Sequence, residues 1–277
     1  MIRALHRWPG LLALALVTVL SLSGAALSVF PAAERIAAPQ AEAGLTVATL
    51  ADRIQAVYPG VEQIRRSPSG RITAYWFDEG TPGAAVIDPA TGEGVASTDP
   101  NQTLRWLTNL HRSLFLGDGG RLAMATGALA MLVLSLSGAA LVARRAGGWR
   151  HWFALLRGPL AGRLHVEIAR IAVIGLVLSS TTAMWMTAST FDLLPDGSAA
   201  PAFPALLSGE TGFAPGRMAT LQQTPVAELR ELSFPYPGDA TDVFTLKTDR
   251  GTGYLDQGDG ALLAWAETLA VQPLLQR

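Results

Sequence analysis

The feature that most constrains this chain is a run of uncharged residues at positions 122–143, flanked by Arg121 and by Arg144-Arg145. About 20 consecutive apolar residues are what an α-helix needs to cross the hydrocarbon core of a bilayer. A segment inside the bilayer has no water to bond its backbone, so it has to be helical. Residues 8–33 and 164–191 have the same apolar character. The sequence therefore predicts a membrane protein with three transmembrane helices.

One nine-residue sequence, Val-Leu-Ser-Leu-Ser-Gly-Ala-Ala-Leu, occurs twice, at residues 19–27 and 133–141. Each copy lies inside a predicted span and follows a histidine, His6 or His111. We interpret the repeat as a duplicated unit that consists of a histidine and a membrane helix with a patch of small residues. A plainer interpretation is that the serines of the two copies only bond to backbone carbonyls one turn away. These serines are Ser21, Ser23, Ser135 and Ser137.

Charge is distributed unevenly along the chain, although the formal net charge is only −1. Residues 1–33 contain Arg3 and Arg7 but no acidic residue, and Glu167 is the only acidic residue between positions 119 and 191, among several arginines. By the positive-inside rule these basic segments face the cytoplasm. The N-terminus is therefore expected inside and the acidic segments outside. Nothing in the charge indicates a nucleic-acid partner.

The soluble segments show strand and helix patterns. A helix at residues 47–58, followed by short strands at 61–66, 71–77 and 84–88, predicts one helix packed on a small antiparallel sheet. Further strands are predicted at 229–234, 243–247 and 253–255, and residues 253–263 resemble residues 85–94. The fold class is therefore membrane α-helical with α+β modules outside the cytoplasm.

These patterns divide the chain into six predicted segments. They are an N-terminal transmembrane helix (residues 1–33), a soluble module (39–100), an amphipathic helix with the second span (103–145), a basic inner loop (146–163), the third span (164–191) and a second, degenerate module (192–277). The first segment also has the features of a signal peptide, but its apolar run is long for one, and we interpret it as an uncleaved helix.

The histidines are the candidate ligands. His6 and His165 lie at the inner ends of the first and third predicted spans, so both rings are expected at one depth. His111 lies at the outer end of the second span, where no other histidine is predicted. Ligating side chains at membrane depth are functional candidates, and imidazole is a good ligand for haem iron. The alternative for each histidine is that it only anchors the chain at the lipid headgroups, and we prefer this interpretation for His151.

The surroundings of the histidines suit a haem. Three arginines lie near His6 or His165 in the sequence and could pair with haem propionates: Arg7, Arg163 and Arg170. Small residues one or two turns from the histidines leave room for a ring: Gly10, Ala169 and Ala172. The chain has no cysteine, no P-loop and no dinucleotide-binding glycine motif, so a flavin or nicotinamide site would lie elsewhere.

The motifs Leu5-His6-Arg7-Trp8-Pro9-Gly10, Leu110-His111-Arg112 and Leu164-His165 resemble those of PepSY-associated transmembrane proteins, and residues 45–97 resemble a PepSY module. The resemblance implies a haem-b protein of the bacterial inner membrane with its modules in the periplasm. It also implies His6 and His165 as inner haem ligands and His111 as one outer ligand. Such proteins have four spans, so we expect that this chain is either short or the front part of a longer protein.

The resemblance also implies a function. We expect the membrane component of a haem-dependent electron-transfer system, similar to the ferric-siderophore reductases of iron uptake. Electrons from NAD(P)H would arrive through a flavin held by a partner or by a further C-terminal portion. The alternative is a non-enzymatic, membrane-anchored PepSY module that binds or regulates a periplasmic protein or peptidase, for instance by strand addition.

Overall fold

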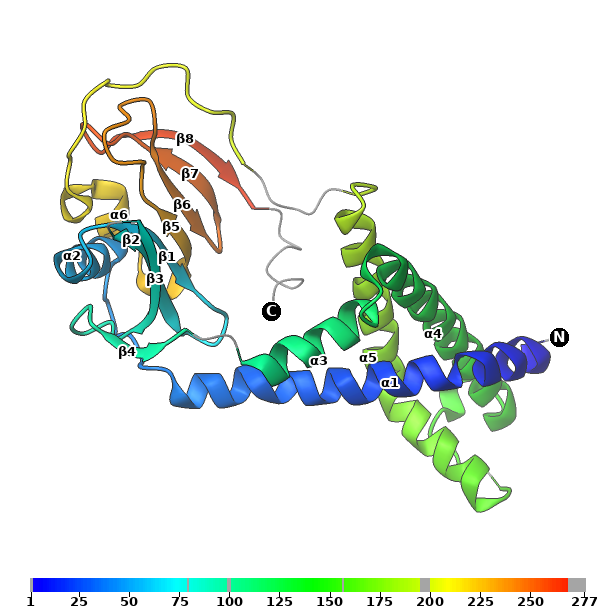
Figure 1. Ribbon diagram of the computed structural model, residues 1–277. Helices are drawn as coiled ribbons and strands as arrows, with labels where there is room; N and C mark the ends of the chain where they lie inside the picture. Colours follow the sequence, from blue (N-terminus) through cyan, green and yellow to red (C-terminus); the bar gives the residue numbers. More distant parts are fainter. Residues whose placement is uncertain (1, 79, 99–100, 156, 195–199, 269–277) are drawn as a thin grey trace. The chain divides into compact units, whose positions relative to one another are not determined.

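The computed structural model describes residues 2–78, 80–98, 101–155, 157–194 and 200–268 (Figure 1). The predicted segment boundaries at residues 1, 100 and 277 lie outside these ranges. The chain forms two compact units. We call the first, Met1–Ser28 with Asn101–Asp196, the helical unit, and the second, Val29–Pro100 with Gly197–Arg277, the sheet unit.

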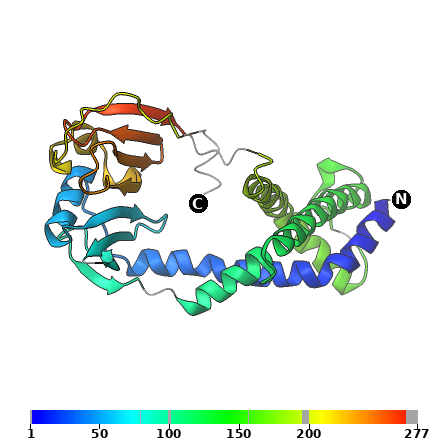
Figure 2. The ribbon, with the colours of Figure 1, turned by 45° about the horizontal axis from the view of Figure 1, so that its top comes forward.

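Four helices make up most of the helical unit: the first part of α1 (Ile2–Ala37), α3 (Gln102–Ser113), α4 (Gly117–Ala146) and α5 (Leu160–Thr190). Three segments are long and apolar enough to cross a membrane, namely Ala13–Ala37 within α1, the whole of α4 and the whole of α5. The prediction of three transmembrane helices is thereby confirmed. Figure 2 shows the helices of this unit from a second direction.

A tight turn joins α3 to α4 and places His111. Leu114 and Phe115 adopt left-handed backbone conformations, with φ of 49° and 62°, which non-glycine residues rarely do. The chain then returns so closely that a β-carbon at Gly120 would lie 1.7 Å from the carbonyl oxygen of Ser113. Only glycine fits there, so Gly120 allows the end of α3 to pack against the start of α4.

Glycines also let α1 approach α4. A β-carbon at Gly127 of α4 would lie 2.8 Å from Leu16 of α1, and one at Gly10 of α1 would lie 3.4 Å from Leu134 of α4. These close approaches are typical of helix packing in membranes, where small residues replace a hydrophobic driving force. Gly10 therefore lies at a contact between α1 and α4, and its expected role beside a haem stays a prediction.

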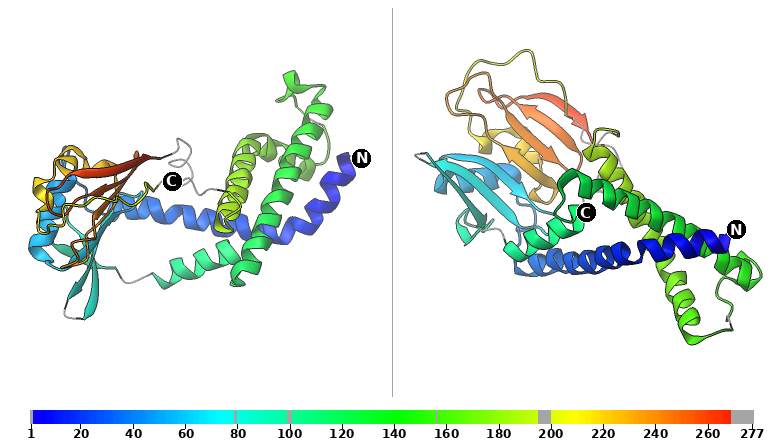
Figure 3. Two further views of the ribbon diagram at one scale, coloured as in Figure 1. Left: turned by 90° about the horizontal axis from the view of Figure 1, so that it is seen from above. Right: turned by 45° about the vertical axis from the view of Figure 1, so that its right-hand side comes forward.

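The sheet unit contains one antiparallel sheet of eight strands in the order β4-β3-β2-β1-β5-β6-β7-β8 (Figure 3). The strands are β1 (Val61–Arg66), β2 (Ile72–Asp78), β3 (Thr81–Ile87), β4 (Gly94–Ser97), β5 (Leu229–Ser233), β6 (Phe244–Thr248), β7 (Gly251–Leu255) and β8 (Leu262–Glu267). The two predicted modules thus share a single sheet. They join where β1 pairs with β5, with Ile64 opposite Leu232.

Both halves of the sheet have the same order, a helix followed by four strands. Helices α2 (Val47–Val57) and α6 (Ala219–Gln223) lie on the same side of the sheet (Figure 1). Their apolar side chains enter one core with those of the central strands, which includes Leu50, Ile54, Ile64, Leu221 and Leu232. Burial of these side chains on one face of each element explains why the hydrophobic pattern predicted the sheet so well.

The turns that follow β3 and β7 also correspond. The carboxylate of Asp88 accepts a hydrogen bond of 2.9 Å from the backbone of Ala90, and that of Asp256 accepts one of 2.7 Å from the backbone of Gly258. Such short-range bonds are how aspartate stabilises a turn. The similarity of residues 253–263 to residues 85–94 therefore reflects equivalent hairpins in the two halves.

Candidate functional site

The helical unit brings together two histidines from separate helices. His6 lies near the start of α1 and His165 near the start of α5. The centroids of their rings are 6.3 Å apart and the ring planes are inclined at 68°. Two residues that are 159 positions apart in the sequence thus form one potential binding site, which we call the inner histidine pair.

His6 is held by α4. Its Nδ1 lies 3.0 Å from Oγ of Ser137. The next residue is Gly138, whose missing side chain makes space for the ring, since a β-carbon there would lie 3.0 Å from Cε1 of His6. The ring is partly buried, whereas His165 is exposed on the surface of the described chain.

His111 has the same kind of neighbours on α1. Its Nδ1 lies 2.9 Å from Oγ of Ser23, and a β-carbon at Gly24 would lie 3.1 Å from its Cε1. Ser23 and Ser137 occupy the same position in the two copies of the nine-residue repeat, as do Gly24 and Gly138. His6 of α1 therefore contacts the repeat copy on α4, and His111 of α3 contacts the copy on α1.

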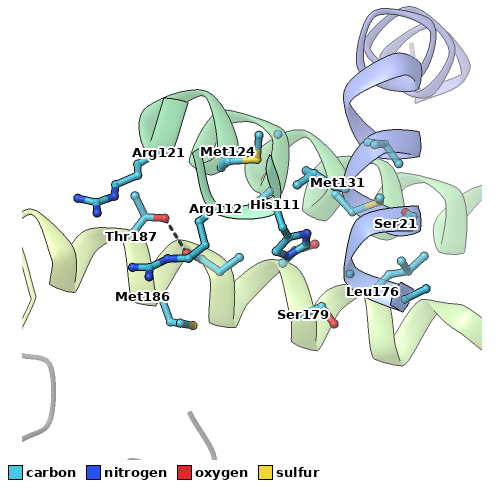
Figure 4. Close-up of a pocket in the computed structure, with 18 of the residues that line it drawn as sticks. Ser21, His111, Arg112, Arg121, Met124, Met131, Leu176, Ser179, Met186 and Thr187 are labelled. Carbon is cyan, nitrogen blue, oxygen red and sulfur yellow. Dashed lines mark hydrogen bonds between the residues drawn. The ribbon is translucent and has the colours of Figure 1, made fainter. Parts of the chain in front are cut away.

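A cavity of about 540 Å³ surrounds His111 (Figure 4). Its lining is largely apolar and comes from α1, α3, α4 and α5. Arg112 and Arg121 lie together at one end near Thr187, while Met131 and Leu176 lie toward the other end. The cavity thus has a cationic end and an apolar body, with an imidazole between them. A flat, apolar molecule with acidic groups at one edge matches this distribution.

The three arginines that were predicted to pair with propionates have different surroundings. The guanidinium of Arg7 lies over the ring of Trp8, 5.7 Å from its centroid. Arg163 is exposed in the first turn of α5. Neither side chain has an ion-pair partner within the part of the chain that the structure describes, so both could bind an acidic group.

Arg170 is different because protein groups already engage it. Its side chain is 1 % exposed and forms an ion pair of 2.7 Å with Glu167, as the spacing of the two residues predicts. It also donates a hydrogen bond of 2.7 Å to the carbonyl of Ala154. Arg170 therefore ties the loop between α4 and α5 to α5. Its Nε has no hydrogen-bond partner among the described residues, and a role in binding a propionate stays a prediction.

The remaining histidine and the acidic residues add no metal site. His151 is exposed in a short 3₁₀ helix, Trp149–His151, next to the stacked rings of Trp149 and Trp152. Aromatic and basic residues of this kind are typical of a membrane interface. No group of three or more His, Cys, Asp or Glu side chains could hold a metal ion in the described ranges. The inner histidine pair and His111 are therefore the candidate ligands.

A protein-family model of the PepSY-associated TM region matches residues 3–271. The chain belongs to this family. The matched residues include all three spans and both halves of the sheet. The match confirms the resemblance to the family that the sequence showed. No curated protein and no solved structure shows a significant match to the chain.

Sequence reasoning placed the histidines of this PepSY-associated TM protein but missed their partners. The plainer interpretation, in which Ser23 and Ser137 bond to backbone carbonyls, describes bonds that are present, but the contacts of these serines with His111 and His6 were not predicted. The signal was the nine-residue repeat itself. An identical sequence in two helices suggests an identical task, but the sequence could not show which histidine each copy contacts.

Proposed function

We propose that this protein is the haem-b-binding membrane part of an electron-transfer system that reduces chelated ferric iron, such as a ferric siderophore, on the periplasmic side of the bacterial inner membrane. The observation that carries the proposal is the inner histidine pair, whose ring centroids are 6.3 Å apart. The family and the three apolar helices support a membrane location.

The ring separation fits a single metal ion between two imidazoles. A metal–nitrogen bond of about 2.0 Å on each side, with roughly 1.1 Å from each ring nitrogen to its ring centre, adds up to about 6.2 Å. Two neutral imidazoles are a common axial ligand set for haem iron. His6 and His165 would hold the iron, and Arg7 and Arg163 would bind the propionates.

Haem b bound by two imidazoles supplies a one-electron redox centre with no open position for oxygen. The protein has histidines at two levels along α1. His6 belongs to α1 itself, and His111 contacts α1 at Ser23. At about 1.5 Å per residue, the interval from residue 6 to residue 23 corresponds to about 25 Å. This is close to the hydrocarbon thickness of about 30 Å, so ligands at two levels would divide the distance across the membrane.

The charge distribution supports the direction of transfer. Basic residues at the inner end of α1 and in the loop after α4 favour a cytoplasmic location for the inner histidine pair. An electron donor in the cytoplasm, a flavin reduced by NAD(P)H, would then face the inner site, and the ferric chelate would be outside. Each ferric ion takes up one electron, so one NAD(P)H would reduce two ferric ions.

The test is the absorption spectrum of the full chain, purified in detergent from cells supplied with haem precursor. We expect a Soret band that shifts on reduction with dithionite, and reoxidation of the reduced protein by a ferric chelate. His6→Ala and His165→Ala should remove most of the haem at the inner site. His151→Ala is the matched control and should keep it.

A colourless protein, or haem content unaffected by either His6→Ala or His165→Ala, would contradict the proposal. In that case a membrane-anchored module that binds a periplasmic partner would be the better description. A coloured protein that ferric chelates do not reoxidise would separate haem binding from the proposed substrate.

A further inference from the structure

The two serine–histidine contacts are equivalent in the repeat. Oγ of Ser137 lies 3.0 Å from Nδ1 of His6, and Oγ of Ser23 lies 2.9 Å from Nδ1 of His111. Each serine is buried, at 8 % and 4 % exposure respectively. Two independent copies of one local sequence thus make the same contact with a histidine from a different helix.

Each serine hydroxyl also lies near a carbonyl of its own helix. Oγ of Ser23 is 3.2 Å from the carbonyl oxygen of Leu20, and Oγ of Ser137 is 3.2 Å from that of Leu134, the equivalent residue of the other copy. Ser23 has a second carbonyl, that of Val19, at 2.7 Å. Both hydroxyls therefore have a backbone acceptor within hydrogen-bonding distance.

The direction of the histidine bond depends on the tautomer of the ring. A hydroxyl has one proton to donate, and a carbonyl oxygen can only accept. When the serine proton is directed to the backbone carbonyl, the serine oxygen accepts a hydrogen bond from Nδ1–H of the histidine. In a neutral imidazole that carries its proton on Nδ1, the lone pair is on Nε2. This is the nitrogen that remains available to a metal.

The glycine after each serine completes the contact. A β-carbon at Gly138 or Gly24 would lie 3.0 or 3.1 Å from Cε1 of the respective ring, closer than side chains normally pack. The ring edge that carries Nδ1 and Cε1 therefore lies on the helix backbone. We call each serine–glycine pair, Ser137-Gly138 or Ser23-Gly24, a histidine seat.

We propose that Ser137 and Ser23 are positioning residues that fix the tautomer and the orientation of the haem-ligating histidines. This inference rests on the proposed function for the identity of the ligand, but the tautomer can be tested without haem. Hydrogen-bond partners of metal-ligating histidines fix the ring and increase the basicity of the ligating nitrogen, and their loss typically weakens metal binding about ten- to a hundredfold.

Ser137→Ala is the test variant and Ser135→Ala is its matched control. Ser135 lies two residues away on α4 and is equally buried, at 8 % exposure, but its hydroxyl has no hydrogen-bond partner among the described residues. The two variants remove the same atom from the same helix. They differ in the contact with His6, so a general effect of removing a buried hydroxyl would appear in both.

The first measurement is nitrogen NMR of the haem-free full chain in detergent, labelled in histidine and assigned with the His6→Asn variant. We expect His6 to carry its proton on Nδ1 in the wild type and in Ser135→Ala, and to lose this preference in Ser137→Ala. The second measurement is haem binding and midpoint potential. We expect Ser137→Ala to bind haem about ten- to a hundredfold more weakly and to have a more positive potential, because a less basic imidazole stabilises ferric iron less.

A wild-type His6 with its proton on Nε2 would overturn the inference, and so would a Ser137→Ala protein that does not differ from Ser135→Ala. If Ser137→Ala does not fold, the tautomer of His6 in the wild-type protein still tests the inference. Absence of haem from a wild-type protein with the expected tautomer would instead overturn the proposed function.

Discussion

The ring of His6 lies directly on Gly138 of α4, where a β-carbon would be 3.0 Å from Cε1 of the imidazole. A glycine at this position is therefore a requirement of the contact between α1 and α4, in addition to any role in helix packing. The relationship also explains why the repeat ends its polar part with Ser-Gly, since the serine binds the ring and the glycine makes space for it.

The first prediction concerns this contact. Gly138→Ala should displace the His6 ring and destabilise the helical unit by about 1–3 kcal/mol, the usual cost of overpacking, with reduced haem content. Gly175→Ala is the control, because nothing lies within 4 Å of a β-carbon at that position of α5, and alanine favours a helix by up to about 1 kcal/mol. Thermal unfolding in detergent and the haem-to-protein ratio are the measurements. Equal behaviour of the two variants would contradict the contact.

The second prediction concerns the ties of Arg170 to Glu167 and Ala154. Arg170→Met should leave the Ala154 carbonyl without its donor and loosen the loop between α4 and α5, at a cost of about 1–3 kcal/mol. Hydrogen exchange of residues 147–155 should increase, while Arg144→Met, an exposed arginine at the end of α4, should have no effect. Unchanged exchange would show that the loop does not depend on Arg170. Haem content measured on the same sample tests whether Arg170 also binds a propionate.

The third prediction tests whether the eight strands form one cooperative sheet. Ile64 of β1 and Leu232 of β5 are fully buried and lie opposite each other. Ile64→Ala should cost about 2–5 kcal/mol, as is usual for truncation of a buried aliphatic side chain. Hydrogen exchange should increase in both β2 and β6. Val95→Ala, at a 54 % exposed position of β4, serves as the control. An increase confined to β2 would mean that the two halves unfold independently.

The fourth prediction concerns the pH dependence of the sheet unit. Burial raises the pKa of Asp256, but hydrogen bonds donated by Ser208 and by the backbone of Gly258 outweigh burial and hold the pKa below its usual value. A carboxyl group whose pKa is lower in the folded than in the unfolded chain stabilises the fold at pH values above its unfolded pKa of about 3.9. This contribution is lost as the pH falls through the folded pKa.

Asp256→Asn should therefore destabilise the sheet unit at neutral pH by about 1–3 kcal/mol. The difference from the wild type should shrink below about pH 4, where the wild-type carboxyl takes up its proton. Asp259→Asn changes an exposed carboxylate in the same turn and is the control. The measurement is hydrogen exchange of β7 and β8 in the full chain over a pH series. A difference that stays constant with pH would contradict the role of the carboxylate charge.

Local patterns were sufficient for most secondary structure. Strand β1 begins and ends at the predicted residues, and α2 ends one residue before its predicted end. Turn residues bound both elements, namely Pro59-Gly60 and Ser67-Pro68. Helix α6 and strand β8 are among the elements that were not predicted. Helix α6 is only five residues long, too short to show a period, and β8 is an edge strand with several exposed positions.

The candidate site could be predicted only in part. The topology of three spans put His6 and His165 at one end of their helices, and the structure brings the two rings together. The crossing of α1 and α4 places Gly10 beside Leu134, a contact that the sequence did not predict. Which faces of the helices meet depends on crossing angles, and a mostly apolar helix does not encode them in its hydrophobic pattern.

The sequence by itself determined that three segments are long and apolar enough to cross a membrane as helices, because runs of this length and composition have no other stable conformation in a bilayer. It also determined that two helices carry the same Ser-Gly sequence. Only the tertiary structure decided that His6 contacts the copy on α4 and His111 the copy on α1, and that two modules share one sheet. These are contacts between residues far apart in the chain, and they depend on how whole elements pack.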